Sequence, residues 1–205
     1  MIRLPEDLPP MPQLRRILTL GLTATLLLPA APAPVFRDGF ESPPVSGQGR
    51  RLPTGSHIGP WTVTAGDVDL ATTSLWQTPA GRQTLDLDGD TNGTVSTTIA
   101  VRPLTTYKVT YALAGNPAAD PMLKTGQVRV NGKTVQRFTF DTSLTSLSKM
   151  AFTSRSVYVF ALSRQLRLDF ASTTTPAGYG PVLDDVRVDS CLVILCPSTK
   201  KATRA

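Results

Sequence analysis

The sequence predicts an all-β fold, a two-sheet jelly-roll sandwich. Short segments in which apolar and polar residues alternate recur along the chain, and turn-forming residues separate them. The 18 prolines and 15 glycines interrupt the chain too often for helices. About ten antiparallel strands in roughly 155 residues suit a jelly roll, whose concave face or loop rim can receive a sugar chain.

The expected strands alternate most regularly at two places. Tyr-Lys-Val-Thr-Tyr at 107–111 and Leu-Arg-Leu-Asp-Phe at 166–170 each put apolar side chains on one face, which then covers a core. Asn131-Gly132 predicts a two-residue hairpin turn, because a type I′ turn requires positive φ at both central residues. We expect strands at residues 61–64, 68–72, 83–87, 94–101, 106–114, 126–130, 134–140, 154–161, 165–171 and 182–188.

The N-terminal segment is typical of a secretory signal peptide. Arg15 and Arg16 precede an apolar run of about 12 residues, whereas a membrane span needs about 20. Glu6 and Asp7 fit poorly in a positive n-region, and a start at Met11 removes them. We therefore expect a signal peptide at 1–33, a folded domain at 34–190 and a secreted, periplasmic or cell-surface location.

The remaining charge is basic and partly gathered in a C-terminal tail at 191–205. The full chain carries a formal charge of +6, and Lys200, Lys201 and Arg204 lie near its end. A solvated tail is one interpretation, and attraction to acidic wall polymers such as pectin or teichoic acid is the other. Interleaved aromatic and basic stripes are absent from the sequence, which argues against a nucleic-acid partner. Cys191 and Cys196 are the only cysteines, and we expect them to form a local disulfide.

Several motifs together resemble the choice-of-anchor C family, which is related to plant cell-wall proteins classed as domain of unknown function 642. They span about residues 36–188 in order. The motifs are Asp-Gly-Phe-Glu-Ser-Pro-Pro-Val at 38–45, Leu-Pro-x-Gly-Ser-x-Ile-x-Pro-Trp-Thr-Val at 52–63, Val-Asp-Leu at 68–70, Leu-Asp-Leu-x-Gly at 85–89, Tyr-x-Val-x-Tyr-x-Leu-Ala-Gly-Asn-Pro at 107–117, Phe-Thr-Phe-Asp-Thr at 138–142 and Tyr-Gly-Pro-Val-Leu-Asp-Asp-Val-x-Val at 179–188.

The resemblance implies an exported, galactose-binding-like jelly roll that is associated with walls or cell surfaces and has no known catalysis. Bacterial relatives often carry a C-terminal sorting anchor. Here only four consecutive aliphatic residues follow Cys191, far fewer than a membrane span requires. We therefore expect no membrane span in the mature chain.

The resemblance also implies a structural calcium ion. Carbohydrate-binding jelly rolls hold such an ion where the first and last strands meet, and Glu41, Asp184 and Asp185 supply hard oxygen ligands there. The alternative is that these acids cap turns or pair with arginines. The segment 88–93 resembles half of an EF-hand loop, but Ile99 stands where the bidentate glutamate belongs, which favours a hairpin turn.

Sugar binding requires flat aromatic rings and planar polar groups. Trp76 and Gln77 precede a turn, so we expect Trp76 on a loop rim, available to stack on a sugar. Asn116 and Tyr179 lie in predicted loops, where binding residues concentrate, although both also suit turns. Trp61 lies on an alternating strand and is expected in the core.

No catalytic residue is predicted. His57 is the only histidine and is expected in a surface loop, without the elbow motif or orienting acid of a hydrolase. A carboxylate pair drawn from Asp86, Asp88, Asp184 and Asp185 is the one arrangement that would suit a glycoside hydrolase.

Three functions therefore remain. The first is a secreted, non-catalytic carbohydrate-binding module for cell-wall or extracellular polysaccharide. The second is a protein-interaction module that docks on a cell-wall enzyme, as the plant relatives suggest for pectin methylesterases, and the third is hydrolysis.

Overall fold

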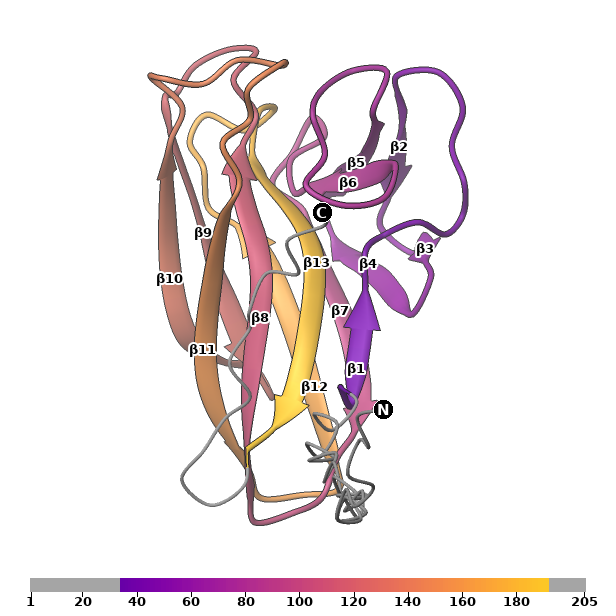
Figure 1. Cartoon of the computed structure of the whole chain (residues 1–205), viewed down its shortest axis with the longest axis vertical. Coiled ribbons are helices and arrows are strands. Elements are labelled where there is room, and N and C mark those ends of the chain that lie inside the picture. Colours follow the sequence, from indigo (N-terminus) through magenta and orange to yellow (C-terminus); the bar gives the residue numbers. More distant parts are fainter. Residues whose placement is uncertain (1–33, 192–205) are drawn as a thin grey trace, which may run out of the picture. The chain divides into compact units, whose positions relative to one another are not determined.

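A computed structural model describes residues 34–191 of the chain. These residues form thirteen β-strands and no α-helix (Figure 1). The strands are β1 (Phe36–Asp38), β2 (Gly49–Pro53), β3 (His57–Ile58), β4 (Trp61–Ala65), β5 (Asp67–Thr72), β6 (Gln83–Asp86), β7 (Thr94–Ala100), β8 (Thr105–Gly115), β9 (Leu123–Val130), β10 (Lys133–Asp141), β11 (Thr153–Ala161), β12 (Gln165–Ser172) and β13 (Pro181–Ser190).

The strands form two antiparallel sheets, which confirms the all-β prediction. One sheet has the order β11-β8-β13-β6-β5-β2, and the other has the order β10-β9-β12-β7-β4-β3. Strand β13 joins two parts of its sheet, because Val182 and Leu183 pair with β6 while Val186 to Val188 pair with β1. A register shift after Asp184 separates these two halves of β13.

The core fills the space between the sheets and follows from the alternation of apolar residues. Trp61 is fully buried, with its ring centroid 5.7 Å from those of Phe36 and Phe40 and 5.8 Å from that of Phe170. The ring of Tyr111 lies 5.0 Å from that of Phe170 and extends the aromatic cluster. The expected core position of Trp61 is therefore confirmed.

The hairpin predicted at Asn131-Gly132 is also confirmed. Val130 of β9 pairs with Lys133 of β10, and the two turn residues have φ of 50° and 79°. Positive φ at both positions is what this turn requires.

Two local expectations are wrong. His57 lies on the short strand β3 rather than in a loop, although it is exposed as expected; its Nδ1 is 3.2 Å from Thr62 Oγ1. Residues 88–93 do form a turn, closed by an antiparallel bridge between Asp88 and Asn92, but the flanking strands β6 and β7 belong to different sheets and do not pair as a hairpin. The short, charged or glycine-rich strands β1, β2 and β3 were not predicted, because they carry too little apolar alternation to be read from the sequence.

The expectations for the signal peptide and for most of the tail concern residues 1–33 and 192–205, which lie outside the described residues. Cys191 is the last residue described, so its disulfide with Cys196 stays a prediction. Between residues 34 and 191 there is no helix long and apolar enough to cross a bilayer.

Candidate binding groove

A groove with a volume of about 340 Å³ lies along β2, β5 and β6. Arg51, Asp69, Ala71 and Asp86 reach it from these three strands, because Arg51 pairs with Asp69 and Asp69 pairs with Asp86 across the sheet. Residues paired directly across antiparallel strands project from the same face. The full lining is Gln48, Gly49, Arg50, Arg51, Asp69, Leu70, Ala71, Leu75, Trp76, Asp86 and Asn116.

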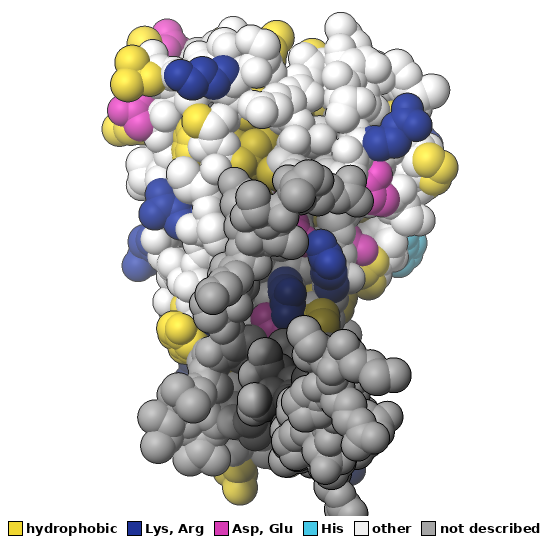
Figure 2. Space-filling model, viewed as in Figure 1, with side chains coloured by type: hydrophobic (Ala, Val, Ile, Leu, Met, Phe, Trp, Pro, Cys, Tyr) yellow, Lys and Arg dark blue, Asp and Glu magenta, His cyan; other side chains and the backbone are white. Residues whose placement is uncertain are grey.

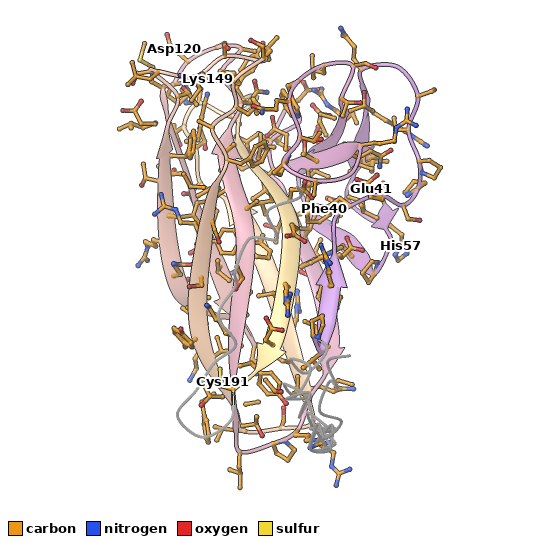
Figure 3. The ribbon with its side chains drawn as sticks, in the orientation of Figure 1. Phe40, Glu41, His57, Asp120, Lys149 and Cys191 are labelled. Carbon is orange, nitrogen blue, oxygen red and sulfur yellow. The ribbon has the colours of Figure 1, made fainter. Side chains whose placement is uncertain are left out.

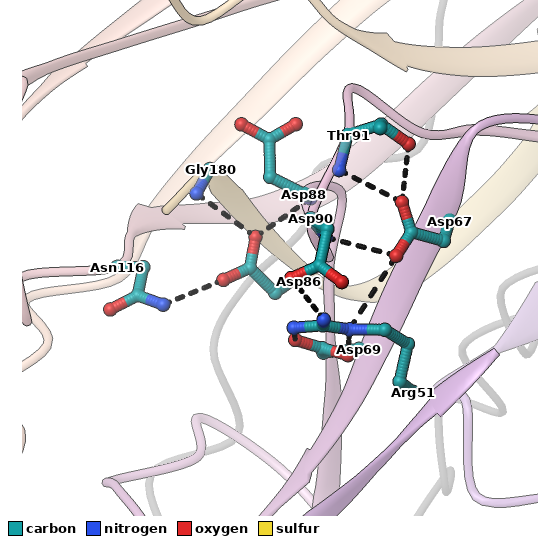
Figure 4. Close-up of polar contacts among 9 residues, drawn as sticks. All are labelled: Arg51, Asp67, Asp69, Asp86, Asp88, Asp90, Thr91, Asn116 and Gly180. Carbon is teal, nitrogen blue, oxygen red and sulfur yellow. Dashed lines mark hydrogen bonds and ion pairs between the residues drawn. The ribbon is translucent and has the colours of Figure 1, made fainter. Parts of the chain in front are cut away.

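Arg51 is the centre of an acidic network at one end of the groove (Figure 4). Its Nε donates to Asp69 Oδ1 at 3.0 Å and lies 3.5 Å from Asp67 Oδ2, and its guanidinium also pairs with Asp90. Asp67 in turn accepts the backbone N–H groups of Asp90 and Thr91, both at 2.9 Å. These contacts fasten the 88–92 segment to β2 and β5, and the single positive charge of Arg51 offsets part of the negative charge of the three aspartates.

Asp86 lies at the base of the groove and is almost completely buried, with 1% of its surface exposed. Its Oδ1 accepts the N–H groups of Asp88 and Gly180, and its Oδ2 accepts Asn116 Nδ2 at 2.8 Å. Burial raises the pKa of Asp86 to about 8 despite these donors, and the neighbouring charges of Asp88 and Asp69 raise it further. Asp86 therefore holds the ends of β6 and β8 and the start of β13 together.

Asp88 and Lys124 are two further buried charged side chains whose charges act on each other. Burial raises the pKa of Asp88 and lowers that of Lys124, and the two opposite charges partly compensate each other. Asp88 Oδ2 has no hydrogen-bond partner within the described part of the chain. Lys124 Nζ donates to the Ala119 carbonyl at 2.8 Å and lies 5.9 Å from the centre of the Tyr179 ring.

The structure brings two of the four predicted sugar-binding residues together. Trp76 and Asn116 both line the groove. Trp76 is only 4% exposed, and its indole N–H donates to Thr84 Oγ1 at 2.9 Å, so it contributes an edge of the wall rather than an open stacking face. Gln77 points elsewhere and accepts the Met150 N–H at 3.3 Å, while Tyr179 is 39% exposed beside Lys124.

A second cavity of about 410 Å³ is lined mainly by polar residues. Thr72, in its lining, donates its N–H to the Gln48 carbonyl and its hydroxyl to the Gly47 carbonyl. The lining of this second cavity is Glu41, Pro44, Val45, Ser46, Gly47, Thr72, Thr73, Ser74, Arg82 and Gln83.

The three predicted calcium ligands do not converge. Asp184 is buried and its Oδ2 has no hydrogen-bond partner in the described region; burial raises its pKa to about 7, and the charge of Glu41 contributes to the rise. Glu41 follows β1 (Figure 3). Its Oε1 accepts the N–H groups of Arg82 and Gln83. Asp185 instead pairs with Arg37 at 3.1 Å. Among residues 34–191 there is no group of three His, Cys, Asp or Glu side chains placed to hold a metal ion.

Two side chains that a hydrolase could use are engaged by protein partners. His57 lies on β3 and hydrogen-bonds Thr62, and Asp69 is engaged by Arg51. In Figure 2, basic and acidic side chains are dispersed over the visible face rather than collected in one continuous patch.

Several groove residues were missed from the sequence, among them Gln48, Arg50, Arg51 and Asp69. Each of them belongs to β2, to β5 or to the loop before β2. Because β2 was not predicted from the sequence, its residues could not be placed beside Asn116, which follows β8. The one available sign was the acidic alternation Asp67, Asp69 on a strand, which puts two carboxylates on one face.

A family model and several solved structures match the chain. Residues 35–189 match a family model described as "Protein of unknown function (DUF642)". No curated protein matches the chain significantly. Similar solved structures include a family 35 carbohydrate binding module from Clostridium thermocellum, with 11% identity, a TM-score of 0.46 and coverage of 68% of this chain and 97% of that one. CBM35 from Paenibacillus barcinonensis has 20% identity, a TM-score of 0.44 and coverage of 68% and 98%. These values are too low to carry a conclusion about ligand or activity.

Proposed function

The chain belongs to the DUF642 family, as its motifs indicated, and we propose that its β-sandwich is a secreted module that binds cell-wall or extracellular polysaccharide without catalysis. The groove along β2, β5 and β6 is the observation that carries this proposal. Secretion rests on the predicted signal peptide at residues 1–33.

The chemistry of the groove suits a sugar. Leu75, Ala71 and the edge of Trp76 offer apolar surface, and Asp69, Asn116 and the guanidinium groups offer planar hydrogen-bonding partners for hydroxyls. Small-ligand sites commonly combine an apolar lining with a few placed polar groups and occupy about 300–1,000 Å³. The groove fits this description at about 340 Å³.

The same geometry supports binding rather than hydrolysis. A glycosidase needs a proton donor that reaches the glycosidic oxygen. Asp86 has the raised pKa of such an acid, but it is 1% exposed and both of its oxygens accept protein N–H groups. Asp69, its neighbour across the sheet, is held by Arg51.

A glycan array followed by calorimetric titration tests the proposal. The secreted chain should bind at least one wall polysaccharide, and Gln48→Ala in the groove should weaken that binding. Gln165→Ala removes the same side chain from an exposed position on β12 and should leave the affinity unchanged. If no glycan binds a folded protein, or if both variants behave alike, the groove is not a sugar site.

A protein-docking function is the second candidate, because β11 exposes two aromatic side chains. Tyr158 and Phe160 are each 57% exposed and lie two residues apart, hence on the same face of an edge strand. A wall-modifying enzyme such as a pectin methylesterase would bury these rings. A pull-down with that enzyme should then fail for Tyr158→Ser, and capture that is unaffected by this change would remove the candidate.

We further propose that Glu41 and Asp184 hold a structural calcium ion together with backbone oxygens. The support is the buried Asp184 Oδ2, which has no partner among the described residues, since an unpartnered buried carboxylate oxygen is costly unless a cation compensates it. Calcium would fasten the segment after β1 to β13 and raise the melting temperature, because it binds only the folded state.

Melting temperatures with calcium and with a chelator test this second proposal. The calcium-dependent rise should disappear in Asp184→Asn and persist in Asp185→Asn, because Asp185 pairs with Arg37 instead. Equal melting temperatures in calcium and chelator would refute the calcium site.

A further inference from the structure

The outer face of the sheet β10-β9-β12-β7-β4-β3 carries basic side chains on three neighbouring strands. In β10, β9 and β12, the residues that alternate with the buried core positions point away from the sandwich. Arg137 of β10, Arg129 of β9 and Arg167 of β12 hold such outward positions, and we call these three residues the basic face. Lys133 is also exposed, at the start of β10.

The strand register brings two of these arginines to one buried carboxylate. Arg129 pairs with Asp169 of β12 across the sheet, and Arg167 lies two residues before Asp169 on the same face. Arg167 Nε donates to Asp169 Oδ1 at 2.9 Å, whereas Arg129 Nε lies 3.7 Å from Asp169 Oδ2. The buried Arg129 Nε has no hydrogen-bond partner between residues 34 and 191. Two guanidinium groups therefore share one negative charge.

The remaining charge of the basic face is not compensated by the protein. Neither Arg137 nor Lys133 takes part in the ion pairs of the described residues. Within the described strands of this sheet, Asp169 and Asp141 are the only acids. Asp141 ends β10, about 13 Å from Arg137 along an extended strand, which exceeds the screening length of about 8 Å at physiological ionic strength. The face therefore keeps an excess of positive charge.

The chemistry of this face suits an array of phosphate groups rather than a sugar chain or a nucleic acid. On the described strands β9, β10 and β12 no outward residue is aromatic, so no ring is placed to stack on a sugar or a base. Neither the groove nor the second cavity includes a residue of these strands. Guanidinium groups bind phosphate oxygens through paired N–H donors, and strands about 4.8 Å apart present these donors side by side on one sheet face.

We propose that the basic face docks on an anionic lipid surface, with Arg129, Arg137 and Arg167 in contact with headgroup phosphates. Each basic residue close to such a surface typically strengthens binding about fivefold, and the attraction falls off within a Debye length. The groove along β2, β5 and β6 belongs to the other sheet, so a glycan in the groove and a lipid surface would contact different strands. This contact is separate from carbohydrate binding and would hold the module at a membrane surface.

Sedimentation of the secreted chain with lipid vesicles tests the proposal. The vesicles consist of phosphatidylcholine alone or of equal parts phosphatidylcholine and phosphatidylglycerol, in chelator so that calcium does not bridge protein and lipid. We expect binding to the anionic vesicles to be at least about tenfold tighter at low salt, and added salt to remove the difference. Equal binding to both vesicles, or binding to neither, would overturn the proposal.

Three matched variants test which residues make the contact. Arg137→Gln and Arg167→Gln should each weaken binding to the anionic vesicles about fivefold. Arg82→Gln removes the same charge from an exposed position outside this sheet and should have no effect. If all three variants behave alike, vesicle binding follows the net charge or the basic residues at 200–204, and the proposal is overturned.

A soluble anionic polymer separates lipid from polysaccharide as the partner of the basic face. Polygalacturonate is titrated into the wild type and Arg137→Gln by calorimetry. We expect Arg137→Gln to weaken binding to the vesicles and to leave any binding of polygalacturonate unchanged. The reverse pattern would assign the face to an acidic polysaccharide and overturn the lipid contact. Failure of every glycan to bind would remove the proposed carbohydrate function and leave the lipid contact intact.

Discussion

The replacement of Asp86 by Asn should remove a specific dependence of stability on pH. Asp86 is fully buried, and its folded-state pKa is about 8 against an ordinary value of 3.8. Between these values the folded protein keeps a proton that the unfolded chain releases. Stability is therefore lost as the pH rises from about 4 to about 8.

The magnitude follows from the linkage between protonation and folding. One proton changes the free energy of unfolding by about 1.4 kcal/mol per pH unit, so Asp86 contributes a loss of at most about 4 kcal/mol between pH 5 and pH 8. Asn keeps a carbonyl oxygen for the Asp88 and Gly180 N–H groups but cannot titrate. At pH 5 the variant should be less stable than the wild type, because the new amide group, a donor, faces the donor Asn116 Nδ2. Between pH 5 and pH 8 its free energy of unfolding should fall by less than that of the wild type.

Urea unfolding at several pH values in chelator measures this slope. The buried Asp88 and Asp184 stay in both proteins, so the difference between the two slopes isolates Asp86. Asp141→Asn, at an exposed carboxylate at the end of β10, should reproduce the wild-type slope between pH 5 and pH 8. Parallel stability curves for wild type and Asp86→Asn would refute the assignment of a raised pKa to Asp86.

Three further changes test the packing of the sandwich by urea unfolding. Trp61→Ala should cost about 3–5 kcal/mol, because the indole is fully buried among three phenylalanine rings, and a loss below about 1 kcal/mol would contradict its core position. Gly126→Ala should cost about 1–3 kcal/mol, since a Cβ would lie 2.4 Å from the Phe138 ring; an unchanged midpoint would show that the ring moves freely. Gly132→Ala meets no atom within 4 Å but has φ of 79°, so it should cost about 1 kcal/mol through backbone strain alone, and a stabilising effect would contradict the turn.

Local patterns predicted the strands that build the core. The alternation at 107–111 and 166–170 has a physical cause, because residues two apart share a face and half of them must leave water. The same reasoning placed Trp61 in the core and Asn131-Gly132 in a turn. Apolar alternation did not predict β2 and β3. Both strands lie at sheet edges and bury few side chains, so their sequences show little alternation.

The groove could not be predicted because it depends on which strands become neighbours. Asp69 and Asn116 are far apart in sequence and line the same groove only because of the strand order β8-β13-β6-β5. The Asp, Asn and Gly residues at 88–93 correctly indicate a turn, but local sequence does not show that the chain crosses there to the other sheet. Asp185 resembled a calcium ligand, but the register shift after Asp184 directs its side chain to Arg37.

Hydrogen–deuterium exchange of the whole secreted chain, with and without its tightest glycan, tests most directly that the groove is the binding site. The account predicts slower exchange at residues 48–51 and 69–76, the segments that contribute most of the groove lining. Protection confined to β10 and β11, at 133–141 and 153–161, would place the glycan elsewhere and contradict the account.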